Sequence, residues 1–199
     1  MTRRRWITAA LALGAVLATG CDKLGPSRSP FFGVDVTGAK MGGDLRLKDP
    51  TGKDRSLADF RGKVVALFFG YTHCPDVCPT TLADMAKAMK LLGPDAKGVQ
   101  VLFVMVDPKR DTPELLAQYV PAFDPSFLGL WGDAGATATA TKAFNIYFQE
   151  RAGKDAASYT VDHTAQSFVI DKEGRLRLVW PYGIEVAQMA GDLKVLLNS

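Results

Sequence analysis

VVALFFGYTHCPDVCPTTL, residues 64–82, runs from a strand through a loop with two cysteines into a helix. The continuous apolar run of residues 64–69 has the length expected of a strand that is buried on both faces. Apolar residues spaced three and four apart predict a helix over residues 77–92, which Gly93-Pro94 ends. A buried strand that feeds directly into a helix indicates an α/β fold.

Strand and helix signals alternate along the rest of the chain. Residues 172–175 carry a turn signal that makes the two segments around them a hairpin. The pattern predicts a central mixed β-sheet with helices on both faces and an added hairpin. The other predicted strands are residues 44–47, 99–106, 166–171 and 176–180. One further helix is predicted to begin at residue 112, and two more cover residues 134–144 and 186–197.

The first twenty residues are typical of a bacterial export signal. Arg3 to Arg5 precede an apolar run over residues 6–17 that is too short to span a bilayer as a helix. The sequence LATGC that ends at Cys21 resembles a lipoprotein box, which implies lipidation of that cysteine. We therefore expect a signal peptide over residues 1–20, a flexible tether over 21–30 and one folded domain over 31–199.

These features predict a protein on the periplasmic face of the bacterial inner membrane, held there by a lipid anchor. Ordinary signal cleavage, which would give a soluble periplasmic protein, is the alternative. The formal net charge of +3 comes from the three arginines of the signal, so the remainder is formally neutral. A neutral body gives no basic footprint for nucleic acid, and we expect a monomer without nucleic-acid partners.

Cys74 and Cys78 lie at the end of a predicted strand and the start of a predicted helix. A helix N-terminus stabilises thiolate, and ligands gather at the carboxyl ends of strands in such sheets. Cysteines four apart can share one face of a helix, close enough for a common metal ion or a disulfide. The spacing is one residue wider than the C-x-x-C redox motif, and two thiolates suit Cu(I). Disulfide exchange, metal binding and a structural disulfide all remain open at this point.

His163 is the candidate third ligand. It precedes the strand predicted over residues 166–171, which would bring it to the same sheet edge as the cysteines. Imidazole accepts both oxidation states of copper, so a Cys₂His set would hold Cu(II) as well as Cu(I). A surface or structural histidine is the alternative reading.

Three motifs together resemble the Sco/SenC copper proteins. They cover the cysteine loop, the segment after the second buried strand and the segment that ends at the candidate histidine. The resemblance extends over roughly residues 30–198, and its weakest part is residues 128–141. The motifs are FGYTHCPDVCPTTL (69–82), VDPKRDTP (106–113) and YTVDH (159–163).

This resemblance implies a thioredoxin-like fold in which Cys74, Cys78 and His163 bind one copper ion. Family members help to build the binuclear copper centre of cytochrome c oxidase, as metallochaperones, as reductases of its cysteines, or both. The implied partner is the copper-site subunit of the oxidase or another periplasmic copper chaperone. Whether the chain is also an enzyme stays open, because delivery and reduction would use the same two sulfurs.

A periplasmic thiol-disulfide oxidoreductase that uses the same cysteine pair is the main alternative function. Such enzymes usually place a proline opposite the pair, but this chain has none between Pro125 and Pro181. A structural zinc site normally needs four protein ligands, and the sequence offers only three candidate sulfur or imidazole ligands. Asp107 and Asp162 are candidates for supporting the site: the first follows a strand, and the second could orient the neighbouring histidine.

Overall fold

A computed structural model describes residues 29–43, 45–153 and 158–199. Within these residues a six-stranded sheet has the order β1-β10-β9-β4-β5-β6. Strands β4, β5 and β6 run parallel, whereas β9 runs antiparallel to β4 and β10 antiparallel to β9. The predicted central mixed sheet is therefore confirmed. Its strands are β1 (Val34–Asp35), β4 (Val64–Gly70), β5 (Val99–Met105), β6 (Leu128–Leu130), β9 (Ser167–Ile170) and β10 (Leu176–Trp180).

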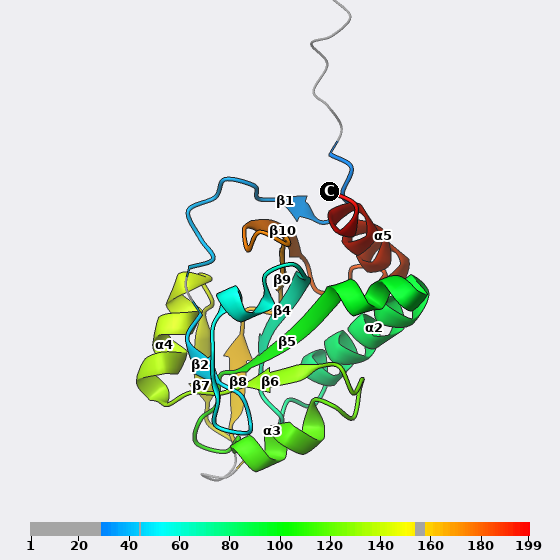
Figure 1. Cartoon of the computed structure of the whole chain (residues 1–199). Helices are drawn as coiled ribbons and strands as arrows, with labels where there is room; N and C mark the ends of the chain where they lie inside the picture. The colour runs from blue at the N-terminus through cyan, green and yellow to red at the C-terminus, as the bar shows by residue number, and fades with distance from the viewer. Residues whose placement is uncertain (1–28, 44, 154–157) are drawn as a thin grey trace, which may run out of the picture.

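Helices cover both sides of this sheet. Figure 1 shows α2 and α5 on one side and α4 on the other. A short helix, α3, begins directly after its N-cap Thr112, whose hydroxyl accepts a hydrogen bond from the Leu115 N–H at 3.2 Å. Two 3₁₀ helices, η1 (Leu57–Phe60) and η2 (Gly93–Gly98), lie in connections. The α-helices are α2 (Val77–Leu92), α3 (Pro113–Tyr119), α4 (Ala134–Ala143) and α5 (Val186–Leu197).

Strand β4 is the centre of the core because every residue from Val64 to Gly70 is buried. It pairs in parallel with β5 along its whole length, from Val64 opposite Val99 to Gly70 opposite Met105. On its other side it pairs with β9. A strand that is buried on both faces requires a continuous run of apolar residues, and this run is the pattern from which the strand was predicted.

Two hairpins lie outside the six-stranded sheet. The first joins β2 (Leu47–Lys48) to β3 (Asp54–Arg55), and the second joins β7 (Phe148–Arg151) to β8 (Thr160–His163). The strand predicted over residues 44–47 is thus shorter and shifted, with residue 44 outside the described part.

The hairpin predicted over residues 166–180 is confirmed, and its strands β9 and β10 belong to the central sheet because β9 pairs with β4. The hairpin outside that sheet, β7–β8, was not predicted. All four residues of β7 are exposed, so this strand lacks the apolar pattern that marks a strand against a core.

The predicted signal peptide, the lipidation site Cys21 and nearly all of the predicted tether fall in residues 1–28, outside the described residues. Among the described residues, no helix is both long enough and apolar enough to cross a bilayer.

The start of the described domain is attached to α5 through one buried carboxylate. Asp192 is fully buried and accepts hydrogen bonds from the backbone N–H groups of Phe32 and Gly33, at 2.7 and 2.9 Å. The indole N–H of Trp180 donates to the same carboxylate at 2.8 Å. One side chain thereby satisfies three donors from two distant segments.

Replacing Asp192 with alanine should destabilise the domain. Two of the three donors, the Gly33 N–H and the Trp180 indole N–H, make buried bonds, and each buried donor left unpaired costs about 1–3 kcal/mol. We therefore expect a loss of at least about 2 kcal/mol in the free energy of unfolding. Urea unfolding followed by tryptophan fluorescence measures it. Asp54→Ala, which removes an exposed ion pair with Lys48, is the control and should change little. Equal midpoints for the two variants would contradict this role of Asp192.

Candidate metal centre

The two cysteines lie on either side of the start of α2. Strand β4 ends at Gly70 and α2 begins at Val77, so Cys74 belongs to the connecting loop and Cys78 to the first helical turn. The expectation that both share one helix face is therefore wrong, because the helix begins after Cys74. The loop itself brings Cys74 back, and the backbone N–H of Cys78 points at its sulfur over 3.4 Å.

Gly70 makes room for the buried sulfur. A Cβ atom at this position would lie 2.8 Å from the Sγ of Cys78 and 2.8 Å from Cε2 of Phe103, closer than such atoms can approach. Cys78 itself is fully buried, whereas Cys74 is partly exposed. The absence of a side chain at the end of β4 thus lets one sulfur sit directly against the sheet.

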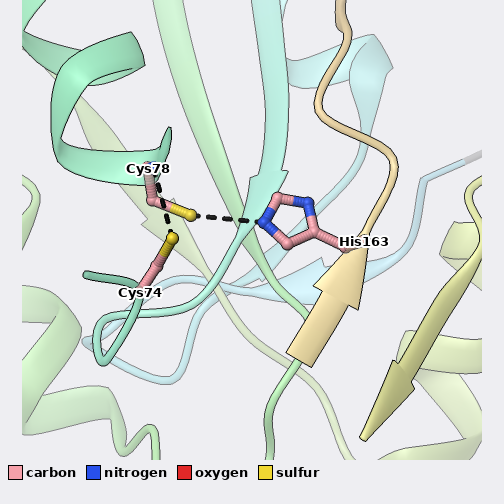
Figure 2. Close-up of side chains that lie close together, drawn as sticks. All are labelled: Cys74, Cys78 and His163. Carbon is pink, nitrogen blue, oxygen red and sulfur yellow. Dashed lines mark hydrogen bonds between the residues drawn. The ribbon is translucent and has the colours of Figure 1, made fainter. Parts of the chain in front are cut away.

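His163 completes the group from the far side. It is the last residue of β8, and its Nε2 lies 3.4 Å from the Sγ of Cys78 (Figure 2). Its Nδ1 lies 3.1 Å from the carbonyl oxygen of Thr164, which can only accept a hydrogen bond. That contact assigns the proton to Nδ1 and leaves the lone pair of Nε2 directed at the sulfurs.

The structure therefore brings together the three predicted ligand residues. The ligand atoms of Cys74, Cys78 and His163 all lie within 4.8 Å of one another. The ring of His163 is held edge-on by Phe68 and by Tyr71, each with 5.9 Å between ring centroids. Two sulfurs and one imidazole nitrogen form a donor set for a soft or borderline metal ion.

The two thiols differ in acidity. The pKa of Cys74 lies well below the ordinary range, chiefly because the Cys78 thiol donates a hydrogen bond to it, whereas burial opposes the shift. The same hydrogen bond, together with burial, raises the pKa of Cys78. The accessible sulfur is consequently the thiolate of the pair, and the buried sulfur keeps the proton.

Asp162 does not orient His163. Its carboxylate accepts from the Nε of Arg151 at 2.6 Å, whereas the Nδ1 contact of His163 is to a backbone carbonyl. The physical reason is the strand: consecutive residues of β8 point to opposite faces, so Asp162 is exposed while His163 faces the cysteines.

Asp107 is hydrogen-bonded to Arg110 and Tyr159 and not to any of the three candidate ligands. It is 2% exposed, and its carboxylate is the acceptor in both bonds. This places it between the turn after β5 and the segment that leads into β8.

Asp111 supports the cysteine loop, a role that sequence reasoning missed. Its carboxylate accepts hydrogen bonds from the backbone N–H and the hydroxyl of Thr72 and contacts Nδ1 of His73 at 3.4 Å. Burial raises the pKa of Asp111, and the bonds from Thr72 oppose the shift. The only sequence signal was its place in the motif VDPKRDTP, since a carboxylate that bonds a loop 38 or 39 positions earlier leaves no local pattern.

Comparison with known proteins identifies the family. The family model SCO1/SenC matches residues 35–198. The chain belongs to the SCO1/SenC family. The prediction made from the three motifs is confirmed.

Mitochondrial and bacterial relatives share about a third or more of the aligned residues with this chain. The mitochondrial SCO2 homolog of Bos taurus is 39% identical over 134 residues, which are 66% of this chain and 50% of that protein. The SCO2-like protein of Rickettsia felis is 34% identical over 137 residues, 68% of this chain and 67% of that protein. The chain thus spans about half the length of the mitochondrial relatives that it matches.

Solved structures of SCO1/SenC proteins have the same fold. ScoI of Bradyrhizobium japonicum with copper bound is 38% identical, with a TM-score of 0.73 over 79% of this chain and 99% of that one. Apo Sco1 of Thermus thermophilus is 42% identical, with a TM-score of 0.76 over 86% of this chain and all of that one. The predicted thioredoxin-like α/β fold is confirmed.

Gly70→Ala should destabilise this SCO1/SenC protein by displacing the Cys78 sulfur. The added methyl would collide with the Cys78 sulfur, and overpacking of this kind costs about 1–3 kcal/mol. Urea unfolding measures the loss. Gly135→Ala in α4 is the matched control, since its Cβ would meet Asp133 at an ordinary 3.4 Å. A Gly70→Ala variant as stable as that control would show that Cys78 is not packed against the strand end.

The acidity difference predicts which cysteine reacts. With copper absent and the thiols reduced, iodoacetamide should label Cys74 already at about pH 5, where an ordinary thiol is protonated, and label buried Cys78 slowly. Peptide mass spectrometry distinguishes the two sites. In Cys78→Ala the hydrogen bond is lost, so the onset of Cys74 labelling should move to higher pH. An unchanged onset would mean that this bond does not set the pKa of Cys74.

Proposed function

We propose that this protein is a copper metallochaperone that works outside the cytoplasm. It binds copper through Cys74, Cys78 and His163 and delivers it to, or prepares the cysteines of, the binuclear copper site of cytochrome c oxidase. The observation that carries this proposal is the meeting of two sulfurs and one imidazole nitrogen within 4.8 Å. Family membership and the copper-bound relative from Bradyrhizobium japonicum support copper as the ion.

The donor set suits both oxidation states of copper. Two thiolate sulfurs favour Cu(I), and the imidazole of His163 makes the site competent for Cu(II). Binding removes the proton of Cys78, because a thiolate is the metal ligand. Cys74 and His163 are partly exposed, so a partner's ligand can reach the ion and take it by ligand exchange.

We further propose that residues 1–20 are a signal peptide, that Cys21 carries a lipid and that residues 21–30 tether the domain of residues 31–199 to the periplasmic face of the inner membrane. In Figure 1 the first described residues lie beside the C-terminus, at the opposite end of the molecule from α3. Helix α3 follows β5, whose carboxyl end lies beside that of β4. A tether attached there would leave the metal centre facing away from the membrane. The expectation of a monomer stays a prediction.

Thiol reduction is the second candidate function, and the unequal acidity of the pair favours it. An accessible thiolate at Cys74 is the nucleophile that attacks a disulfide, and the neighbouring Cys78 thiol can resolve the mixed disulfide. The copper-free, reduced protein would be mixed with the oxidised copper-site domain of the oxidase, and the target's free thiols counted. Reduction by the wild type but not by Cys74→Ser would support this role.

The copper role is tested by titration of the reduced domain with Cu(I) and Cu(II). His163→Ala should weaken Cu(II) binding by at least about a hundredfold, because loss of a ligand costs more than the ~10–100-fold of a supporting residue. Cu(I) binding should remain close to that of the wild type, since both sulfurs remain. His73→Ala is the matched control, as this exposed histidine adjoins Cys74 but lies outside the ligand group. Equal Cu(II) binding with and without His163 would overturn the three-ligand site.

A further inference from the structure

The hairpin that carries His163 lacks the support of the central sheet. Strands β7 and β8 pair with each other and, within the described residues, with no strand of the six-stranded sheet. All of β7 is exposed. An isolated two-stranded hairpin is marginally stable in water. The position of His163 opposite the cysteines must therefore depend on contacts that fasten β8 to the rest of the domain.

A buried ion pair provides the first of these contacts. Arg110 donates from Nε to Oδ2 of Asp107 at 2.7 Å, in the turn after β5. The other carboxylate oxygen of Asp107 accepts from the hydroxyl of Tyr159, also at 2.7 Å. Tyr159 directly precedes β8, so both oxygens of one buried carboxylate are used to join the turn to the hairpin.

Arg110 holds the same segment in two further ways. Its NH1 donates to the backbone carbonyl oxygen of Tyr159 at 2.7 Å, and its guanidinium carbon lies 3.6 Å from the centroid of the Tyr159 ring. The other aromatic ring near this guanidinium is Tyr71, at 5.7 Å. A guanidinium that is stacked, hydrogen-bonded and paired with a buried carboxylate is far more restricted than one in an exposed ion pair.

Tyr71 connects this cluster to the ligands themselves. Its hydroxyl accepts a hydrogen bond from the Val161 N–H at 3.2 Å, and its ring meets the His163 ring edge-on at an interplanar angle of 85°. Its carbonyl oxygen accepts from the backbone N–H of Cys74 at 3.3 Å. One residue thus contacts both the cysteine loop and the strand that ends in the histidine.

We propose that Asp107, Arg110, Tyr159 and Tyr71 form a bracket that positions His163 against the cysteine pair. The bracket binds no metal; it acts through β8, and it sets the distance between the third ligand and the two sulfurs. This inference rests on the proposed function in so far as the positioned site is a copper site. The copper-free protein should already show the bracket, because none of its contacts involves the ion.

An exposed ion pair between the same two segments supplies a matched control. Lys109, next to Arg110, pairs with Glu150 of β7 at 2.6 Å, and both side chains are about half exposed or more. Exposed pairs contribute little to stability. Lys109→Gln therefore removes a link between the turn and the hairpin without touching the bracket, and Arg110→Gln removes the bracket's centre.

The first measurement is amide hydrogen exchange of copper-free, reduced protein. Arg110→Gln and the milder Tyr159→Phe, which deletes only the hydroxyl bonded to Asp107, should speed exchange at Val161 and elsewhere in β8 while β4 and β5 stay protected. Lys109→Gln should match the wild type. Unchanged exchange in both bracket variants would overturn the proposal whatever the protein does with copper.

The second measurement is Cu(II) affinity in a double-mutant cycle with His163→Ala. Arg110→Gln should weaken Cu(II) binding by about tenfold or more, as loss of a residue that orients a ligand typically does. In the His163→Ala background the same change should have no further effect, because the bracket acts through that histidine. An equal loss in both backgrounds would show a general structural effect and overturn the positioning role. If exchange at β8 becomes faster in the bracket variants but His163→Ala leaves Cu(II) binding unchanged, the bracket is supported and the proposed three-ligand site is refuted.

Discussion

The approach of the Cys78 sulfur to the end of β4 is the constraint on which the metal centre depends. Gly70 permits it, since a Cβ atom there would lie 2.8 Å from the sulfur. The hydrogen bond from the Cys78 thiol to Cys74, together with burial, raises the pKa of Cys78, so the proton stays on Cys78 and the negative charge lies on Cys74. Packing at a strand end thus determines which sulfur is accessible and ionised.

The candidate third ligand comes from much further along the chain. His163 follows Cys78 by 85 residues and lies on a hairpin that the central sheet does not hold. A ligand placed by such a hairpin needs its own attachment to the fold. The cluster of Asp107 and Arg110 supplies it, because a buried carboxylate and a stacked guanidinium accept few alternative geometries.

The central architecture was readable from sequence because burial leaves a local pattern. Strands β4 and β5 are continuous apolar runs, and the helices show caps and helical spacing. The hairpin β7–β8 left no such pattern, since β7 is wholly exposed. The proximity of the cysteines was expected for the wrong reason: Cys74 returns through a loop, not along a helix face. The supporting role of Asp111 was also hidden, because side-chain bonds between distant segments have no period.

The two candidate functions exclude each other at any one moment. Copper binding needs electron pairs from both sulfurs as thiolates, and an oxidised pair has no thiolate to offer. Reduction of a target's disulfide leaves Cys74 and Cys78 oxidised, so a molecule that has just reduced its partner cannot also deliver copper until it is itself reduced. His163 is not consumed by this chemistry. The histidine therefore separates the roles: disulfide exchange needs only the sulfurs, and a bracket that holds an imidazole at that distance makes physical sense for a protein that binds a metal ion.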